Sequence, residues 1–192
     1  MTVNVEKLKA MEPPLGTPFR AQKVGHVVLN VMDLERSTAF YTGVLGFRVS
    51  DVYPEEMMRG GMVFLRCGTD HHTIALVGQA RSESLRTDLN HLAFEVGSLD
   101  EVLLARDHLK RHDTRIVFEG RRRAGCQIAV EFLDPDGHHL EIYWGLDQIG
   151  SDHAIRPSSQ WREHRGIEAA IADPPVGQDT TLRNPDLLKP RG

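Results

Sequence analysis

The sequence predicts an α+β fold in which two tandem βαβββ modules form a curved, incompletely closed mixed β-barrel. Residues 24–29 resemble residues 89–94 at a spacing of 65 positions, which indicates an internal repeat. Each copy is followed by a helix-like stretch and then by short extended segments. Because neither copy alone could bury its sheet face, we expect two curved sheets that face each other around a central cavity.

A helix is expected directly after the first strand of each module. At the shift of 65 positions Asp33 aligns with Ser98, and both residue types are good N-caps. Ser98 and Glu101 also form a capping-box pattern. The apolar spacing predicts helices over about residues 34–45 and 99–112, and Gly46 is expected to stop the first.

Three short strands are expected after each helix, because extended apolar runs alternate with turn residues. In the first module they begin at residues 47–49 and continue at 62–66 and 73–77. In the second module they are predicted at residues 115–118, 128–132 and 139–144. Residues 134–137 (DPDG) predict a turn between the last two strands.

The repeat divides the chain into three regions. We expect an N-terminal arm at residues 1–22, a central domain at 23–145 with modules at 23–79 and 88–145, and a C-terminal region at 146–192. The last region is expected to hold one helix over residues 158–172. The Pro-rich, polar tail from Asp173 is expected to wrap a surface or hang free and to add little core.

The composition is typical of a soluble globular protein, with 40% hydrophobic and 26% charged residues. A formal net charge of -4 argues against broad attraction to nucleic acid or anionic membranes. The one basic cluster, residues 121–123, is expected to be a solvated turn. No apolar run is long enough to span a bilayer, and two cysteines make no disulfide framework. We therefore expect a cytoplasmic protein with no nucleic-acid or membrane partner.

Three residues form a candidate metal site: His26, His91 and Glu141. The two histidines occupy the same place in the two repeats, so a pseudo-two-fold axis would bring them close together. Strand alternation puts His139, Glu141 and Tyr143 on one face, which lets the Glu141 carboxylate point into the cavity. A single His or Glu is more often structural or solvated, but these three would be costly to bury without a common partner. The predicted barrel therefore surrounds a metal site.

The repeat position that would supply a fourth ligand is apolar. A shift of 65 positions from Glu141 leads to Leu76, and a shift of 67 leads to Ile74. In either register the site keeps open positions for water, substrate or oxygen. Two His and one carboxylate with open positions are typical of non-haem Fe(II) oxygenases, so we expect Fe(II), with Mn(II) as the alternative.

The chain resembles the vicinal oxygen chelate superfamily over about residues 24–145; that superfamily includes glyoxalase I, fosfomycin-resistance proteins, methylmalonyl-CoA epimerase and type I extradiol dioxygenases. Residues 71–76 (HHTIAL) and 89–92 (LNHL) are similar to the extradiol dioxygenase branch in particular. In that branch the second His of the pair is the active-site acid/base, which corresponds to His72. The resemblance implies a compact one-domain enzyme that cleaves a catechol-type aromatic diol with O2, while His72 accepts a hydroxyl proton and later returns it.

Strand parity places His72 on the same face as Ile74 and Leu76, toward the missing ligand position. The sequence also departs from the family pattern at two points. Family members usually carry a Tyr ten residues before the Glu ligand, where this chain has Glu131. They often carry another His upstream of that Tyr, whereas residues 113–137 contain none.

Two alternatives from other functional classes stay open. A glyoxalase- or epimerase-like lyase or isomerase would use the metal as a Lewis acid, usually with an extra carboxylate in the cavity. The apolar residue at the fourth position argues against it. A metal-free, drug-binding resistance module is the other, and the presence of all three candidate ligands argues against that. The expected partners are a small aromatic diol and O2, and the expected assembly is a homo-oligomer.

Overall fold

The computed structural model describes residues 3–12, 23–85, 89–151 and 154–189, and parts of the expected N-terminal arm and inter-module boundary lie outside them. The first module contains β1 (Val27–Asn30), α2 (Leu34–Gly43), β2 (Arg48–Tyr53), β3 (Met62–Arg66) and β4 (Ile74–Val77). The second contains β5 (Leu92–Glu95), α3 (Leu99–Arg111), β6 (Ile116–Arg121), β7 (Ile128–Leu133) and β8 (His139–Trp144). The flanking regions contain α1 (Val5–Lys9), η1 (Ser158–Gln160), β9 (His164–Arg165), α4 (Ile167–Ala172) and η2 (Pro185–Leu188).

Both modules have the predicted βαβββ order and the same strand arrangement. The first sheet has the order β1-β4-β3-β2, and the second has the order β5-β8-β7-β6-β9. Each helix begins at its predicted cap: Asp33 accepts a hydrogen bond from the backbone N–H of Arg36 at 3.0 Å, and Ser98 accepts one from the N–H of Glu101 at 3.4 Å. Gly46 has a φ of 73°, which suits a residue that ends a helix. The α+β class and the repeat are therefore confirmed.

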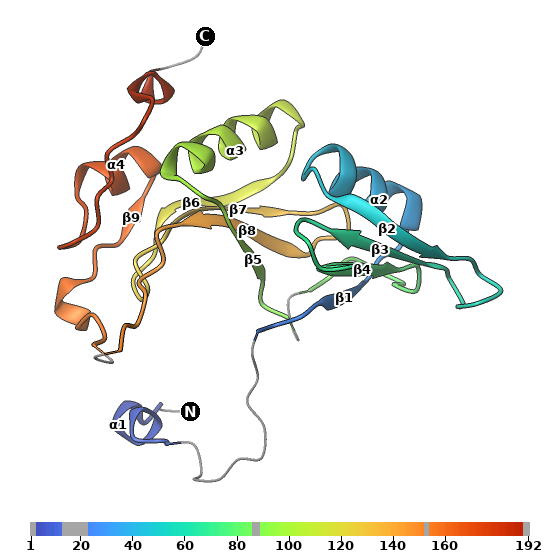
Figure 1. Cartoon of the computed structure of the whole chain (residues 1–192), viewed down its shortest axis with the longest axis horizontal. Coiled ribbons are helices and arrows are strands. Elements are labelled where there is room, and N and C mark those ends of the chain that lie inside the picture. Colours follow the sequence, from blue (N-terminus) through green and yellow to red (C-terminus); the bar gives the residue numbers. More distant parts are fainter. Residues whose placement is uncertain (1–2, 13–22, 86–88, 152–153, 190–192) are drawn as a thin grey trace.

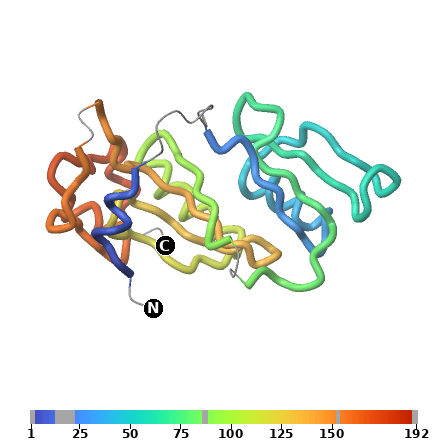
Figure 2. The backbone as a smooth tube through the Cα atoms, turned by 90° about the horizontal axis from the view of Figure 1, so that it is seen from below, coloured from blue at the N-terminus to red at the C-terminus, as the bar shows by residue number. Residues whose placement is uncertain are grey.

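The two sheets stay separate instead of closing into a barrel. Figures 1 and 2 show the modules side by side along the long axis of the molecule, and Figure 1 shows α2 and α3 on the same side of the sheets. The expected cavity between two facing sheets is thus not formed by the described part of one chain. The physical reason lies at the junction between the modules, where buried polar groups and packed rings hold them edge to edge.

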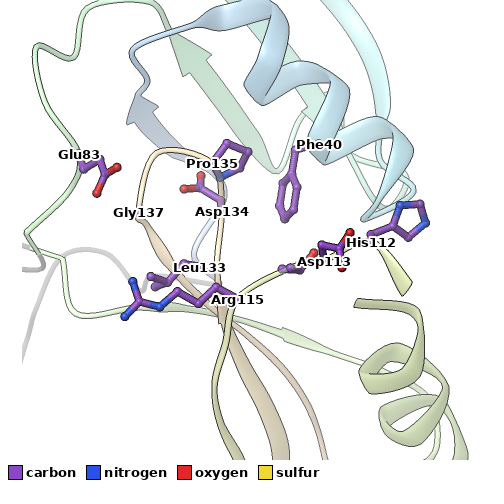
Figure 3. Close-up of a pocket in the computed structure, with 10 residues that line it drawn as sticks. Phe40, Glu83, His112, Asp113, Arg115, Leu133, Asp134, Pro135 and Gly137 are labelled. Atoms are coloured by element: carbon purple, nitrogen blue, oxygen red, sulfur yellow. The ribbon is translucent and has the colours of Figure 1, made fainter. Parts of the chain in front are cut away.

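The predicted turn at residues 134–137 forms this junction as well as reversing the chain. Asp136 is 1% exposed, and its carboxylate accepts hydrogen bonds from the backbone N–H of Met32 at 2.7 Å and from the hydroxyl of Ser37 in the first module. Asp134 accepts a hydrogen bond from the buried Tyr41 hydroxyl at 3.0 Å. Figure 3 shows Phe40 of α2 and the turn residue Asp134 lining one pocket at this junction. Long-range pairing of this kind cannot be predicted from turn propensity.

The apolar residues of both modules form one continuous core. The sheet faces covered by the helices supply most of it, including Leu29, Leu65 and Leu140. The rings of Phe47 and Phe94, from different modules, lie with their centroids 5.4 Å apart. The modules therefore share their hydrophobic stabilisation and do not behave as two independent units.

The C-terminal region differs from its prediction. The helix expected over residues 158–172 is confined to α4, because β9 pairs with β6 before it and Gly166 has a φ of 99°. The tail does add core: Leu182 and Leu187 are 9% and 3% exposed. Asp100 at the start of α3 accepts hydrogen bonds from the N–H groups of two tail residues. Isolated leucines in a polar segment are not detected by composition, which is why this packing was missed.

Among the described residues, no helix combines the length and apolar character that crossing a membrane requires.

Candidate metal centre

Strand pairing identifies the repeat position equivalent to Glu141. Val27 on β1 pairs with Ile74 on β4, whereas the repeat-related Leu92 on β5 pairs with Leu140 on β8. The spacing between the two repeats is therefore 65 positions for the first strands (27 and 92) but 66 positions for the last strands (74 and 140). The equivalent of Glu141 is Ala75, so both sequence-based choices for the fourth position are wrong, although that position is apolar as predicted.

The second module brings two of the predicted ligands into contact. Nε2 of His91 lies 3.1 Å from Oε2 of Glu141. Glu141 is 4% exposed and lies on the face of β8 opposite to Leu140, as strand alternation predicted. Burial raises the pKa of Glu141 and the nearby Glu131 carboxylate raises it further, against the opposing effect of His91. A cation bound here would stabilise the charged Glu141 carboxylate against both burial and the repulsion of Glu131. We call His91 and Glu141 the second half-site.

Glu131 lies directly beside the second half-site. It pairs with Glu141 across β7 and β8 and is 4% exposed. Arg122 donates two hydrogen bonds to its carboxylate, at 2.6 and 3.0 Å, and Nε2 of His139 lies 2.9 Å from it. Burial raises the pKa of Glu131, but the hydrogen bonds and charge of Arg122 outweigh burial and lower it. Glu131 is therefore a paired anion.

The sequence reasoning did not assign this network to the site. The signal was present, because Glu131 is a charged residue inside an otherwise apolar strand, the same pattern that drew attention to Glu141. The basic cluster at residues 121–123 is solvated only in part, because Arg122 and Arg123 are exposed after the end of β6 whereas Arg121 is buried. Arg121 ends β6 with no exposed surface and donates a hydrogen bond to the Ala170 carbonyl at 2.6 Å. Arg122 stacks over Phe118, with 4.1 Å between the guanidinium carbon and the ring centroid.

The first module brings together His26 and His72, which we call the first half-site. Their ring centroids are 4.5 Å apart. The parity argument for His72 is wrong, because β4 begins only at Ile74 and His72 precedes it. An edge-on contact with the Phe64 ring, at 5.0 Å between centroids, holds His72 instead. Lys23 and Asp70 form an ion pair that joins the two segments that carry these histidines.

Both half-sites lie on the sheet faces that the helices leave uncovered. Phe64 on β3 pairs with Ala75, just as Glu131 pairs with Glu141 in the other module. The buried core side chains occupy the alternate positions of the same strands. A cavity of about 630 Å³ lies at the second half-site and is lined by Asn90, His91, Arg122, Arg123, Ala124, Gln127, Glu131, Glu141 and Glu163.

The half-sites are not gathered into one centre within the chain. In the described ranges, no three His, Cys, Asp or Glu side chains come close enough together to hold a metal ion. The groups that shift the pKa of Glu141 all belong to the second module, and those that shift the pKa of His72 belong to the first. The donor set matches a divalent metal in kind, with two imidazoles and a carboxylate, but the single chain separates His26 from the other two donors.

Comparison with known proteins identifies the family to which the chain is similar. The model of the Glyoxalase/Bleomycin resistance protein/Dioxygenase superfamily matches residues 23–142. A 3-methylcatechol 2,3-dioxygenase of Pseudomonas putida is 30% identical over 131 residues, which cover 67% of this chain and 44% of that protein. A biphenyl-2,3-diol 1,2-dioxygenase of Paraburkholderia xenovorans is 33% identical over 131 residues, covering 67% and 43%.

Other comparisons concern the metal and the fold. A manganese-dependent 2,3-dihydroxybiphenyl 1,2-dioxygenase of Geobacillus genomosp. 3 is 27% identical over 129 residues, which cover 66% of this chain and 38% of that protein. Leishmania major glyoxalase I superposes with a TM-score of 0.53 at 25% identity, covering 65% of this chain and 88% of that one. The chain thus spans less than half the length of these dioxygenases but nearly the whole of the glyoxalase structure.

Proposed function

This chain belongs to the glyoxalase/bleomycin resistance protein/dioxygenase superfamily, and on that premise we propose that it is an extradiol dioxygenase that cleaves a catechol-type aromatic diol with O2. The proposed metal is Fe(II), with Mn(II) as the alternative because one relative is named as manganese-dependent. His26, His91 and Glu141 would hold the metal, and His72 would be the acid/base. When bound, the metal would supply the point at which the diol and O2 are held side by side.

The contact between His72 and His26 is the observation that carries the proposal. It puts a second imidazole next to a candidate metal ligand, with 4.5 Å between the ring centroids, in a chain whose relatives are named as dioxygenases of aromatic diols. His72 lies within reach of a diol at that ligand without being one of the three donors. An acid/base beside a metal suits a reaction that begins by removing a hydroxyl proton.

The surroundings of His72 suit a base. Its pKa is lowered, first by desolvation and then by the neighbouring His26 and His71 rings. A ring with a lowered pKa is neutral at neutral pH, so its free nitrogen can accept a proton from the diol. The edge contact with Phe64 fixes the plane of the ring, which limits the directions from which the proton can arrive.

The cavity at the second half-site would help to exclude water and to hold the diol. Because Arg122 neutralises Glu131, the buried carboxylate that remains for a cation is Glu141. Arg122 lines the cavity, and its guanidinium stacks on the Phe118 ring. We propose that this guanidinium contacts the aromatic ring of the substrate.

A metal-dependent lyase or isomerase is the second candidate, and Glu131 is the specific observation that favours it, since such enzymes use an extra carboxylate in the cavity. Ala75 at the fourth ligand position argues against this candidate, and so do the two hydrogen bonds that Arg122 donates to Glu131. A free carboxylate would be needed for a base of that kind.

Oxygen consumption tests the proposal. Protein loaded with Fe(II) or Mn(II) without air is mixed with 3-methylcatechol or biphenyl-2,3-diol, and O2 uptake is followed beside the yellow colour expected of ring-fission products. We expect uptake with at least one diol, and loss of bound metal when His91 or Glu141 is replaced by Ala. Metal-loaded protein that consumes no O2 with any diol would refute the dioxygenase function and leave the lyase as the better candidate.

A further inference from the structure

We infer that the C-terminal region from residue 146 holds the cavity of the second half-site in shape, with Arg121 and Gln178 as the positioning residues. Both side chains bind the carbonyl of Cys126, in the loop at residues 122–127 that lines the cavity. The C-terminal region lies outside residues 23–142, which the family model matches. The inference rests on the proposed function only for the use of this cavity by a diol.

The C-terminal region joins the second sheet directly. β9 pairs with the end of β6, opposite Gly120 and Arg121, and extends the sheet by one strand (Figure 1). Gly120 has a φ of 132°, and a Cβ at this position would lie 2.2 Å from the His164 carbonyl oxygen, so only glycine allows the two strands to approach. Next to β9, Glu163 lines the cavity and accepts a hydrogen bond from Nε of Arg123 at 2.6 Å. The C-terminal region therefore forms part of the cavity wall.

Arg121 fixes the C-terminal region from inside the protein. Its side chain has no exposed surface. It donates hydrogen bonds of 2.6–3.2 Å to four uncharged acceptors: the carbonyls of Cys126, Ala170 and Asp173, and Oε1 of Gln178. The Ala170 carbonyl lies in the last turn of α4, and the residue four positions on is Pro174, which has no N–H to donate to it. Arg121 replaces that donor and so fixes the end of α4 relative to the loop.

Gln178 connects Arg121 with the loop. Its amide nitrogen donates hydrogen bonds to the carbonyls of Cys126 at 2.9 Å and Gly145 at 3.0 Å, while its Oε1 accepts the hydrogen bond from Arg121. Cys126 is fully buried and has a φ of 54°, a conformation that a non-glycine residue keeps only where surrounding contacts hold it. Gly145 directly follows β8, the strand that carries Glu141. Gln178 therefore binds the strained end of the loop to the end of that strand.

The same loop carries side chains that contact both buried carboxylates of the cavity. Arg122 donates two hydrogen bonds to Glu131, and Nε2 of Gln127 donates one to Oε1 of Glu141 at 3.4 Å. A displaced loop would leave Glu131 charged and buried without the Arg122 guanidinium, which is costly and changes the electrostatic field at Glu141. It would also move the guanidinium that we propose contacts the diol. Holding the loop in place thus fixes the charges around the diol.

Two variants of Gln178 separate the positioning of the loop from stability. Gln178→Ala loses all three hydrogen bonds. Gln178→Glu keeps an acceptor for Arg121 but has no N–H for the two carbonyls, so it should keep the Tm of the wild type and still release the loop. Gln148→Ala is the matched control, because the Gln148 amide is exposed and donates to the neighbouring Leu146 carbonyl.

Hydrogen–deuterium exchange of the full-length protein measures how firmly the loop is held. We expect peptides that cover residues 122–127 to exchange faster in both Gln178 variants than in the wild type and in the Gln148→Ala protein. In O2-uptake assays with 3-methylcatechol, KM should rise about 2- to 10-fold, as expected for the loss of one hydrogen bond, while kcat and bound Mn(II) stay unchanged. A purely structural role for Gln178 would lower Tm without changing KM.

The exchange experiment and the O2 assay separate this inference from the proposed function. Exchange of residues 122–127 at the wild-type rate in either Gln178 variant would overturn the inference. Faster exchange with an unchanged KM would overturn it as well, since the loop would then not shape the cavity that the diol uses. A wild type that consumes no O2 with any diol would refute the proposed function alone, and faster exchange in both variants would still support the positioning of the loop by Gln178.

Discussion

Replacing Asp136 by Ala removes the carboxylate that joins the second module to α2. Three groups donate hydrogen bonds to this carboxylate, and the burial of each donor decides how much stability is lost when the carboxylate is removed. The Arg36 side chain is 45% exposed and can turn to water, so its 2.9 Å ion pair adds little. The Ser37 hydroxyl is fully buried and the Met32 N–H is partly buried. Leaving these two donors without an acceptor costs about 1–3 kcal/mol each, so we expect a loss of about 2–6 kcal/mol in the free energy of unfolding.

Urea unfolding followed by circular dichroism measures this loss by linear extrapolation. The matched control is Asp70→Ala, which removes an ion pair with Lys23 in which both side chains are more than half exposed; it should cost at most about 1 kcal/mol. Asp136→Asn keeps an acceptor of similar size, so its loss in the free energy of unfolding should lie between those of Asp136→Ala and Asp70→Ala. An Asp136→Ala protein as stable as the Asp70→Ala protein would show that the junction does not hold the modules together.

Three further predictions concern catalysis, pH and the tail. His72→Gln should keep its bound metal while kcat falls by about 100- to 10,000-fold; unchanged turnover would exclude His72 as the acid/base. Burial lowers the pKa of His138, but the hydrogen bond and charge of Asp134 raise it more, so it is raised overall. The stability that His138 adds should be complete below its ordinary pKa of 6.5 and lost as pH rises through the higher folded value. Thermal unfolding should therefore show a larger deficit for His138→Asn in mild acid than in mild alkali, and an equal deficit would contradict this. Leu187→Ala should cost about 2–4 kcal/mol in urea unfolding because the side chain is buried; Leu188, 38% exposed, is the control, and equal effects would mean that the tail adds no core.

Local structure was predictable because its signals act within a few residues. The caps at Asp33 and Ser98, the stop at Gly46 and the strands at residues 62–66 and 139–144 were all predicted correctly. A cap hydrogen bond spans three residues, and side-chain direction along a strand follows from its period of two. The same local logic placed Glu141 on the uncovered face of β8, where the structure brings its carboxylate 3.1 Å from His91.

The relative register of the strands in the two modules could not be predicted from these local signals. The two halves of the repeat align at 65 positions in their first strands but at 66 in their last, so neither Leu76 nor Ile74 occupies the position equivalent to Glu141. Backbone pairing between strands far apart in sequence decides this, and connections that differ in length by one residue leave no mark in composition. Glu131 was visible in the sequence as a charge in an apolar strand, but its pairing with Arg122 and His139 was not, because these residues meet only across neighbouring strands.

The residues alone are therefore sufficient for the α+β class, the repeat, the family resemblance and the kinds of donor that a metal would need. How those donors are distributed in space depends on the tertiary structure. Asp136 and Asp134 bind groups of the first module that are about 100 positions away in the chain, and these contacts hold the two sheets side by side. Because buried hydrogen bonds between distant segments are worth more than any local preference at the turn, they separate His26 from His91 and Glu141, although the repeat by itself predicted that the three would meet.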